Sequence, residues 1–154
     1  MKRQINLLSF MFLFHHFCFG QTLFINPTGT YKLNSKATVK NGDTYGNFGE
    51  IRVKLLDSTC IVMSFFTCKG APSYNSGSFI DTLTYYNNSC TYIDKEDTAR
   101  ACKVVFTFTK RQIDLKETAN YDYGTCWGQG VVAYGSFRKT DTKTPLIKIP
   151  LMDD

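Results

Sequence analysis

Short stretches in which apolar and polar residues alternate dominate the chain, and turn-forming residues separate them. In residues 50–55, the apolar Ile51, Val53 and Leu55 alternate with charged residues, so one face of a strand is apolar and the other is charged. The run from Cys60 to Cys68 is apolar on both faces, which predicts a central strand or a strand covered by a loop. A period of two residues is typical of β-strands, and no segment has a convincing helical period.

Similar runs lie between turn signals along the rest of the chain, and a strand is expected in each. They cover residues 30–33, 79–86, 89–94, 102–109, 113–116 and 130–138. Asn87 and Asn88 are typical of a hairpin turn, and longer loops are expected over residues 69–77 and 120–129. We therefore predict an all-β fold: a single small antiparallel meander barrel or curved sheet of about eight strands.

The N-terminus has the features of a secretory signal peptide. A basic start precedes an apolar run over residues 7–17, and the small residues Cys18 and Gly20 stand just before Gln21. The run is shorter than the roughly 20 apolar residues of a transmembrane helix. A lipidated Cys18 or a buried core helix is the alternative interpretation.

These features predict the organisation of the chain and its destination. We expect cleavage before Gln21 and no transmembrane segment in the mature chain, which is exported to the periplasm or secreted. The predicted parts are a signal peptide over residues 1–20, a β-barrel domain over residues 21–139 and a polar C-terminal tail over residues 140–154.

Charge and composition exclude several classes of function. The 154 residues include 18 basic and 13 acidic side chains, and loss of two basic residues with the signal peptide leaves a mild net charge of +3. Such an excess, without a basic cluster, does not indicate a nucleic-acid partner. Both histidines, His15 and His16, lie in the predicted signal peptide, so the mature chain lacks the commonest general base and metal ligand. We expect no enzyme activity, no metal site and no cofactor.

Five of the six cysteines lie outside the predicted signal peptide, and an exported protein is expected to form disulfides. In an up-and-down meander, Cys68, Cys102 and Cys126 lie at one end of the barrel, while Cys60 and Cys90 lie at the other. We predict a Cys102–Cys126 disulfide, with Cys60–Cys90 as a weaker candidate. The odd number requires at least one free or intermolecular thiol. Several buried free thiols that act as small hydrophobic residues are the alternative.

The segment from Lys69 to Ser78 is the candidate binding loop. Its proline and glycines set an unusual backbone path, and Tyr74 offers a rigid aromatic side chain of the kind that dominates binding hot spots. A plain connector is the alternative interpretation of the same residues.

Two short motifs on this predicted exported barrel carry a resemblance to a known family. Ser76-Gly77-Ser78-Phe79, and the segment from Cys126-Trp127-Gly128 to Phe137-Arg138, resemble the bacterial periplasmic and secreted lysozyme inhibitors over roughly residues 28–139. The family's loop reads Ser-Gly-x-x-Tyr, and Ile80 stands at the Tyr position here. The resemblance implies that Ser76 hydrogen-bonds a catalytic carboxylate in the lysozyme cleft, and that Lys69 or Arg138 pairs with one.

The first functional hypothesis is therefore an exported, non-enzymatic binding protein that inhibits a lysozyme or another cell-wall hydrolase. Its candidate contact residues are Lys69, Tyr74, Ser76 and Arg138. Because many lysozymes are cationic, the net charge of +3 argues against fast encounter. The alternative is a lipocalin-like carrier of a small apolar ligand, whose aromatic side chains line a cavity. A filled core favours the first hypothesis, and an apolar internal cavity favours the second.

Overall fold

The computed structural model describes residues 23–120, 122, 125–131 and 135–149, and this part of the chain is built from β-strands. The predicted signal peptide and its cleavage before Gln21 lie outside the described residues. The strands are β1 (Gly29–Leu33), β2 (Thr38–Lys40), β3 (Asp43–Asp57), β4 (Cys60–Gly70), β5 (Ser76–Thr84), β6 (Ser89–Ile93), β7 (Lys103–Phe108), β8 (Gln112–Thr118) and β9 (Gly135–Asp141).

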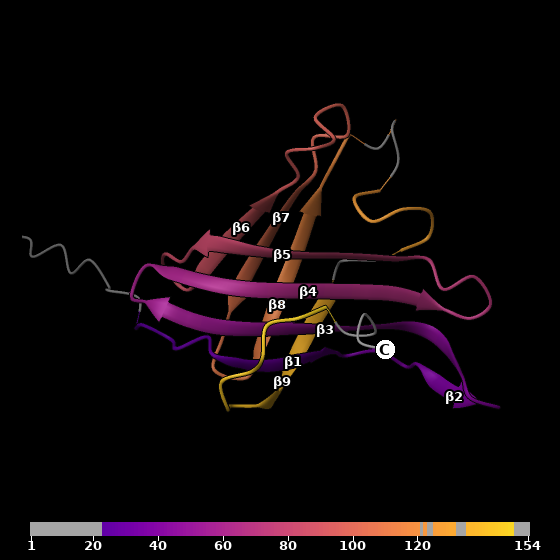
Figure 1. The fold of residues 1–154 in the computed structure, drawn as a ribbon, viewed down its shortest axis with the longest axis horizontal. Helices are drawn as coiled ribbons and strands as arrows, with labels where there is room; N and C mark the ends of the chain where they lie inside the picture. Colours follow the sequence, from indigo (N-terminus) through magenta and orange to yellow (C-terminus); the bar gives the residue numbers. More distant parts are fainter. Residues whose placement is uncertain (1–22, 121, 123–124, 132–134, 150–154) are drawn as a thin grey trace, which may run out of the picture.

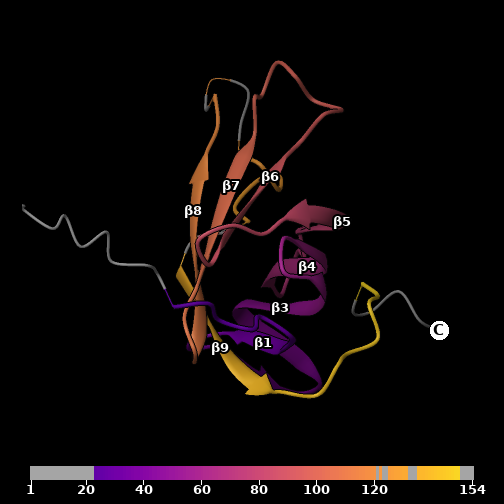
Figure 2. The same ribbon diagram turned by 90° about the vertical axis from the view of Figure 1, so that its left-hand side faces the viewer.

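Eight of these strands form one continuous sheet in the order β5-β4-β3-β1-β9-β8-β7-β6, and β2 pairs with β3 beside it. Every neighbouring pair is antiparallel. In Figure 1, strands β1, β3, β4 and β5 run side by side, and β6, β7 and β8 cross them steeply. Figure 2 shows the two halves as facing layers. The prediction of an all-β antiparallel barrel is confirmed, and the barrel is nearly closed.

The barrel closes in one place and stays open in another. The first strand, β1, pairs with the last, β9, so the two ends of the domain are joined by a ladder. The ends of the sheet are β5 and β6, which follow each other directly in the chain. The opening of the barrel therefore lies between two sequence neighbours.

The short strand β2 and the N-terminal part of β3 lie in a glycine- and asparagine-rich stretch that is outside the strands expected from the sequence. Asn41 and Gly42 have positive φ angles of 53° and 87° and form a tight turn that returns the chain against β2. Gly46, with a φ of 92°, lies where the register between β3 and β4 shifts. These residues make turns and bulges inside a ladder, which alternation of apolar residues does not reveal.

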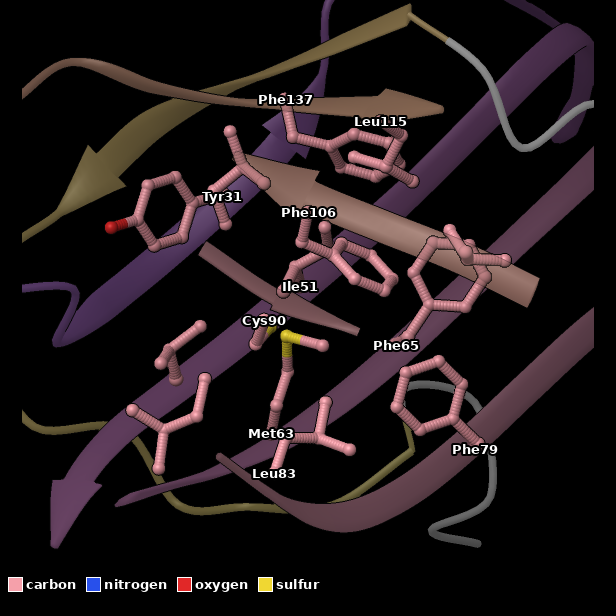
Figure 3. Packing of buried hydrophobic residues seen from close by; sticks show 14 of the residues in the cluster. Tyr31, Ile51, Met63, Phe65, Phe79, Leu83, Cys90, Phe106, Leu115 and Phe137 are labelled. Atoms are coloured by element: carbon pink, nitrogen blue, oxygen red, sulfur yellow. The ribbon is translucent and has the colours of Figure 1, made fainter. Parts of the chain in front are cut away.

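The interior of the barrel is filled by its own aromatic side chains. The ring centroid of Phe65 lies 4.8 Å from that of Trp127, 5.4 Å from Phe79 and 5.9 Å from Phe106. Figure 3 shows side chains from both halves of the sheet pointing into the same space. Each such ring pair adds about 0.5–1.5 kcal/mol beyond the burial of its area. This is a packed core rather than a cavity lined for a ligand.

The turn between β5 and β6 holds the N-terminal segment against the barrel. Asn87 and Asn88 both have left-handed φ angles, 48° and 58°, as a two-residue hairpin turn requires. The buried side chain of Asn88 accepts a hydrogen bond from the Ile25 N–H at 2.8 Å and donates one to the Leu23 carbonyl at 2.8 Å. Tyr85 donates its hydroxyl to the Ile25 carbonyl at 2.7 Å. This end of the β5–β6 pair is therefore fixed.

The predicted Cys102–Cys126 disulfide is confirmed, with a Cα–Cα distance of 5.4 Å. Cys60, Cys68 and Cys90 are free, so the weaker candidate pairing, Cys60–Cys90, is wrong. Cys60 lies opposite Thr84 at the start of β4, whereas Cys90 is buried in β6, and these two strands are separated by β5 and the opening of the barrel.

The last strand begins later and ends later than predicted. β9 runs over Gly135–Asp141, whereas the predicted strand covered residues 130–138. Beyond β9 the chain returns along β3, where Arg52 Nη1 donates to the Leu146 carbonyl at 3.3 Å. Within the described residues, no helix has the length and apolar character needed to cross a membrane.

Candidate functional site

The open place in the barrel forms a cleft of about 550 Å³ between β5 and β6, which we call the β5–β6 cleft. One wall is the first half of β5, and the other is the end of β6 with the turn that follows it. Its lining residues are Ser76–Asp81, Tyr92–Glu96, Cys126 and Trp127.

On the side of this cleft, the backbone of β5 has no strand partner among the described residues. The Lys69 backbone N–H donates to the Asn75 carbonyl at 3.0 Å. At the other end of the strand, the Tyr85 backbone N–H donates to the Thr59 carbonyl at 2.7 Å. Because antiparallel ladders alternate, the odd-numbered residues of β5 bond to β4. The N–H and C=O groups of Ser78 and Ile80 therefore point away from β4, toward the cleft.

The same alternation applies to β6. The Asp94 N–H donates to the Cys102 carbonyl at 3.0 Å, and the Phe108 N–H donates to the Asn88 carbonyl at 2.8 Å. Even-numbered residues of β6 therefore bond to β7, which leaves the backbone groups of Thr91 and Ile93 on the open edge. In the part of the chain that the structure describes, two strand edges without a partner strand therefore face the same cleft.

These two edges belong to a hairpin that is paired only at its turn. Tyr86 and Ser89 exchange two backbone hydrogen bonds of 2.9 Å. Continuing this register would pair Thr84 with Thr91 and then Thr82 with Ile93, but β5 and β6 separate instead. The Thr82 N–H donates to the Asp81 carboxylate at 2.7 Å and is not available for that pairing.

An aromatic stack holds the open arrangement. The rings of Phe79 and Tyr92 stack at a centroid distance of 3.9 Å and an angle of 5°. In the register set by the turn, Leu83 rather than Phe79 would lie opposite Tyr92. Closing the hairpin would therefore break this stack, so the stack favours the open edges.

The floor of the cleft is Trp127, whose ring centroid lies 5.8 Å from Tyr92 and 6.0 Å from Phe79. The disulfide fixes the preceding residue, Cys126, whose N–H also donates to the Glu117 carboxylate at 3.2 Å. The indole N–H of Trp127 has no acceptor among the described residues, although the side chain is buried.

Gly77 allows β5 to lie directly on Trp127. A Cβ atom at position 77 would stand 2.5 Å from the Trp127 Cβ and 2.8 Å from its Cε3. Any larger residue would push the tryptophan and its loop away from β5. Close packing against Trp127 therefore explains why the Ser76-Gly77 motif has glycine at its second position.

Carboxylates surround the mouth of the cleft. Asp81, Asp94 and Glu96 line it, and Lys95 is the one basic residue among the described residues of the lining. Burial raises the pKa of Tyr92, and the negative charges of Asp94, Asp81 and Glu96 raise it further. Asp94 also accepts the Glu96 N–H at 2.9 Å, which fixes the turn after β6. The cleft is locally acidic in a chain whose net charge is +5.

Three of the four predicted contact residues lie on one hairpin beside the cleft. Ser76 is exposed at the start of β5, opposite Cys68. The Lys69 side chain runs past Gly130, where an added Cβ would lie 3.4 Å from its Nζ. Tyr74 donates its hydroxyl to Asp43 at 2.8 Å, so its polar end braces the hairpin against β3.

The fourth predicted residue, Arg138, lies elsewhere. It is on β9, which is four strands from β5 in the order of the sheet, and it pairs with Gln112 and Lys32. There it lines a second hollow, of about 630 Å³, with Lys110, Arg111 and Lys139. We call this second site the basic hollow. Arg138 and Ser76 are on different sides of the barrel.

The carboxylates and rings that shape the cleft were not among the contact residues predicted from the sequence. Asp81 interrupts an inward-facing alternation between the buried Phe79 and Leu83, and a charged residue in such a pattern was the available signal. The sequence around Tyr92 and Trp127 carried no such signal, because the contact between their rings depends on how the two halves of the sheet cross. Among the described residues, no group of three or more His, Cys, Asp or Glu side chains is placed to hold a metal ion.

The arrangement offers binding chemistry: free backbone donors and acceptors, stacked rings and carboxylates around one cleft. No model of a protein family, no curated protein and no solved structure matches this chain, so its geometry has to carry the functional argument.

Proposed function

We propose that this chain is an exported, non-enzymatic binding protein that inhibits a lysozyme or another cell-wall hydrolase with the hairpin from Lys69 to Ser78 and the adjoining β5–β6 cleft. The observation that carries the proposal is the acidic cleft directly beside the exposed Ser76. A cationic hydrolase meets complementary charge there, although the net charge of the inhibitor is positive.

The construction of the hairpin supports a binding role. The Asn75 side chain donates to the Gln129 carbonyl at 2.9 Å, and Tyr74 is held by Asp43. A loop tied at two points loses little conformational freedom when it enters a partner, and preorganisation of this kind favours affinity. The disulfide, in turn, is compatible with an exported protein.

The alternative, a carrier of a small apolar ligand, has less support. The interior is occupied by stacked and edge-on rings around Phe65, each in contact with the next. A carrier barrel needs that volume for its ligand.

The test is inhibition of several classes of lysozyme, and of other cell-wall hydrolases, by the purified mature protein. Wild type is compared with Ser76→Ala, with Ser58→Ala, at an exposed position in the turn between β3 and β4, as the matched control. We expect Ser76→Ala to weaken inhibition by about 1–3 kcal/mol without lowering the thermal stability, and Ser58→Ala to leave inhibition unchanged.

Two outcomes contradict this proposal in different ways. Absence of inhibition at micromolar protein across all hydrolases removes the inhibitor function. Inhibition that survives both Ser76→Ala and Tyr74→Ala keeps the function and removes this hairpin as its site.

A further inference from the structure

We propose that the β5–β6 cleft binds an extended cationic segment of a partner polypeptide as an added β-strand on the open edge of β5. This inference rests on the proposed function, because it assigns the chemistry of the partner at the same site.

The backbone geometry requires an extended ligand. From Ser76 to Ile80 the outer edge of β5 presents alternate backbone groups to the cleft, and the Asp81 carboxylate closes this edge by taking the Thr82 N–H. Such an edge is completed by a strand of about five residues, which contributes one ladder of main-chain hydrogen bonds. Strand addition supplies affinity through the backbone and leaves specificity to the side chains.

The lining of the cleft selects the side chains of the ligand. A strand on this edge turns alternate side chains inward, over Tyr92 and toward Asp81, Asp94 and Glu96. Lysine or arginine suits these positions, because the aliphatic stem packs on the rings while the charged end reaches the carboxylates. The expected ligand therefore has basic residues at every second position.

The same charges argue against a second copy of this chain as the occupant. Pairing of two β5 edges would bring the acidic residues of both cleft walls, Asp81 above all, close to their counterparts. Like charges that face each other across paired strands are destabilising. In addition, an inward-pointing charge on an edge strand is a device that opposes edge-to-edge association.

The test uses synthetic peptides of about seven residues and the mature protein. The first peptide alternates Lys with Thr or Val, the second has Glu in place of Lys, and the third repeats the first with N-methyl groups on alternate backbone nitrogens. Trp127 is the only tryptophan of the chain, so its fluorescence reports occupation of the cleft, and titration calorimetry measures binding independently.

We expect the Lys peptide to bind and the Glu peptide to show no binding. N-methylation removes main-chain donors without changing charge, and it should weaken binding about tenfold or more. Asp81→Asn keeps the acceptor for Thr82 but loses the charge, and it should weaken binding about fivefold. The matched control is Asp114→Asn on β8, which removes the same charge away from the cleft and should change nothing.

Equal binding of the methylated and unmethylated Lys peptides would overturn strand addition, and so would indifference of the affinity to Asp81→Asn. Concentration-dependent dimerisation of the free protein, measured by sedimentation and abolished by Asp81→Lys, would assign the edge to a second copy instead. Hydrolase inhibition without peptide binding removes only this inference, whereas peptide binding without inhibition removes only the proposed hydrolase target.

Discussion

The β5–β6 cleft and the basic hollow have similar volumes, about 550 and about 630 Å³, but they are made from the sheet in opposite ways. The cleft lies where the sheet ends, so backbone groups of Ser78 and Ile80 have no neighbouring strand. The basic hollow lies over β8 and β9, which pair with each other, and the Lys139 N–H donates to the Arg111 carbonyl at 2.8 Å.

This difference separates what each region offers a partner. The hollow has only side-chain charges, and one of them is already engaged, because Lys139 Nζ donates to the Thr28 carbonyl at 3.1 Å and lies 5.0 Å from the Tyr31 ring centre. The cleft combines charge with a free backbone edge and stacked rings. Opposite charges at separate places also orient an approaching cationic partner, so the net charge alone does not decide encounter.

Removal of the disulfide should change the cleft most. Replacing both Cys102 and Cys126 with Ala releases the loop that carries Trp127, and should lower the free energy of unfolding by about 2–5 kcal/mol. Denaturant titration gives the free energy, and a red shift of the Trp127 emission reports loss of the cleft floor. The control Cys60→Ser, at a free thiol, should change the free energy of unfolding by less than about 1 kcal/mol. If Cys60→Ser lost as much stability as the double replacement, the disulfide would have no special role.

Alkaline pH should affect two groups, the buried Cys90 in the core and Lys139 in the basic hollow, with opposite signs. Burial raises the pKa of Cys90 on β6 to about 12, so the folded state holds this proton above pH 9 and loses stability as pH rises toward 12. The loss is at most about 1.4 kcal/mol per pH unit, and Cys90→Ala should remove it. Burial lowers the pKa of Lys139, so its contribution to stability increases as pH approaches 10.5.

Thermal unfolding between pH 8 and pH 11 measures both effects. Lys139→Met should make the alkaline loss of stability steeper than in wild type, whereas Cys90→Ala should make it shallower. The same pH slope in wild type and both variants would contradict these assignments.

Gly77→Ala should disturb the cleft and spare the hollow. Its Cβ would approach within 2.5 Å of the Trp127 Cβ, and relief of this contact should cost about 1–3 kcal/mol of stability. The neighbouring Ser78→Ala, at an exposed position, is the control and should stay near wild type. Equal melting temperatures for the two variants would mean that the loop of Trp127 moves without cost.

Hydrogen exchange should distinguish the two regions in the unmodified protein. The Ile80 amide faces the open edge, whereas the Lys139 amide is bonded to Arg111, so Ile80 should exchange on the order of a hundredfold faster. Comparable protection at both amides would show that the cleft is closed in solution. Saturation with the Lys peptide should slow hydrogen exchange at the Ile80 amide and leave exchange at the Lys139 amide unchanged.

The smallest expected effect comes from charges on the hollow. The double change Lys110→Gln and Arg111→Gln reduces repulsion of a cationic partner from the far side, and should raise the association rate about twofold at low salt. Rapid-mixing fluorescence at two salt concentrations checks this. A larger change in affinity than that of Asp81→Asn would place the binding site in the hollow.

Alternation along the chain was sufficient to predict most strands. Ile51 and Val53 of β3, and Ile61, Met63 and Phe65 of β4, lie inside the barrel because a period of two places them on one face of each strand. The Cys102–Cys126 bridge followed from the ends of predicted strands. Both the buried faces and the disulfide depend on single strands and on where they end, and the alternation of residues in the sequence indicates both.

The cleft could not be predicted in the same way. A two-residue turn between two β-type runs favours a paired hairpin. Asn87 and Asn88 therefore indicated pairing of β5 with β6, the place where the barrel is open. The separation depends on Phe79 meeting Tyr92 and Trp127, which is set by the crossing of the two halves of the sheet. Arg138 was grouped with Ser76 through a resemblance in motifs, and sheet order separates them.

The pairing of β1 with β9 has a consequence for how the chain folds. The ladder that closes the barrel joins residues more than a hundred positions apart, such as Lys32 with Arg138, and it cannot form until the last strand is available. Contacts of this separation are slow to form, whereas a hairpin with a short turn forms within microseconds. In this molecule the pair of strands most distant in sequence is joined, whereas β5 and β6, which follow each other in the chain, are left open at the edge of the sheet.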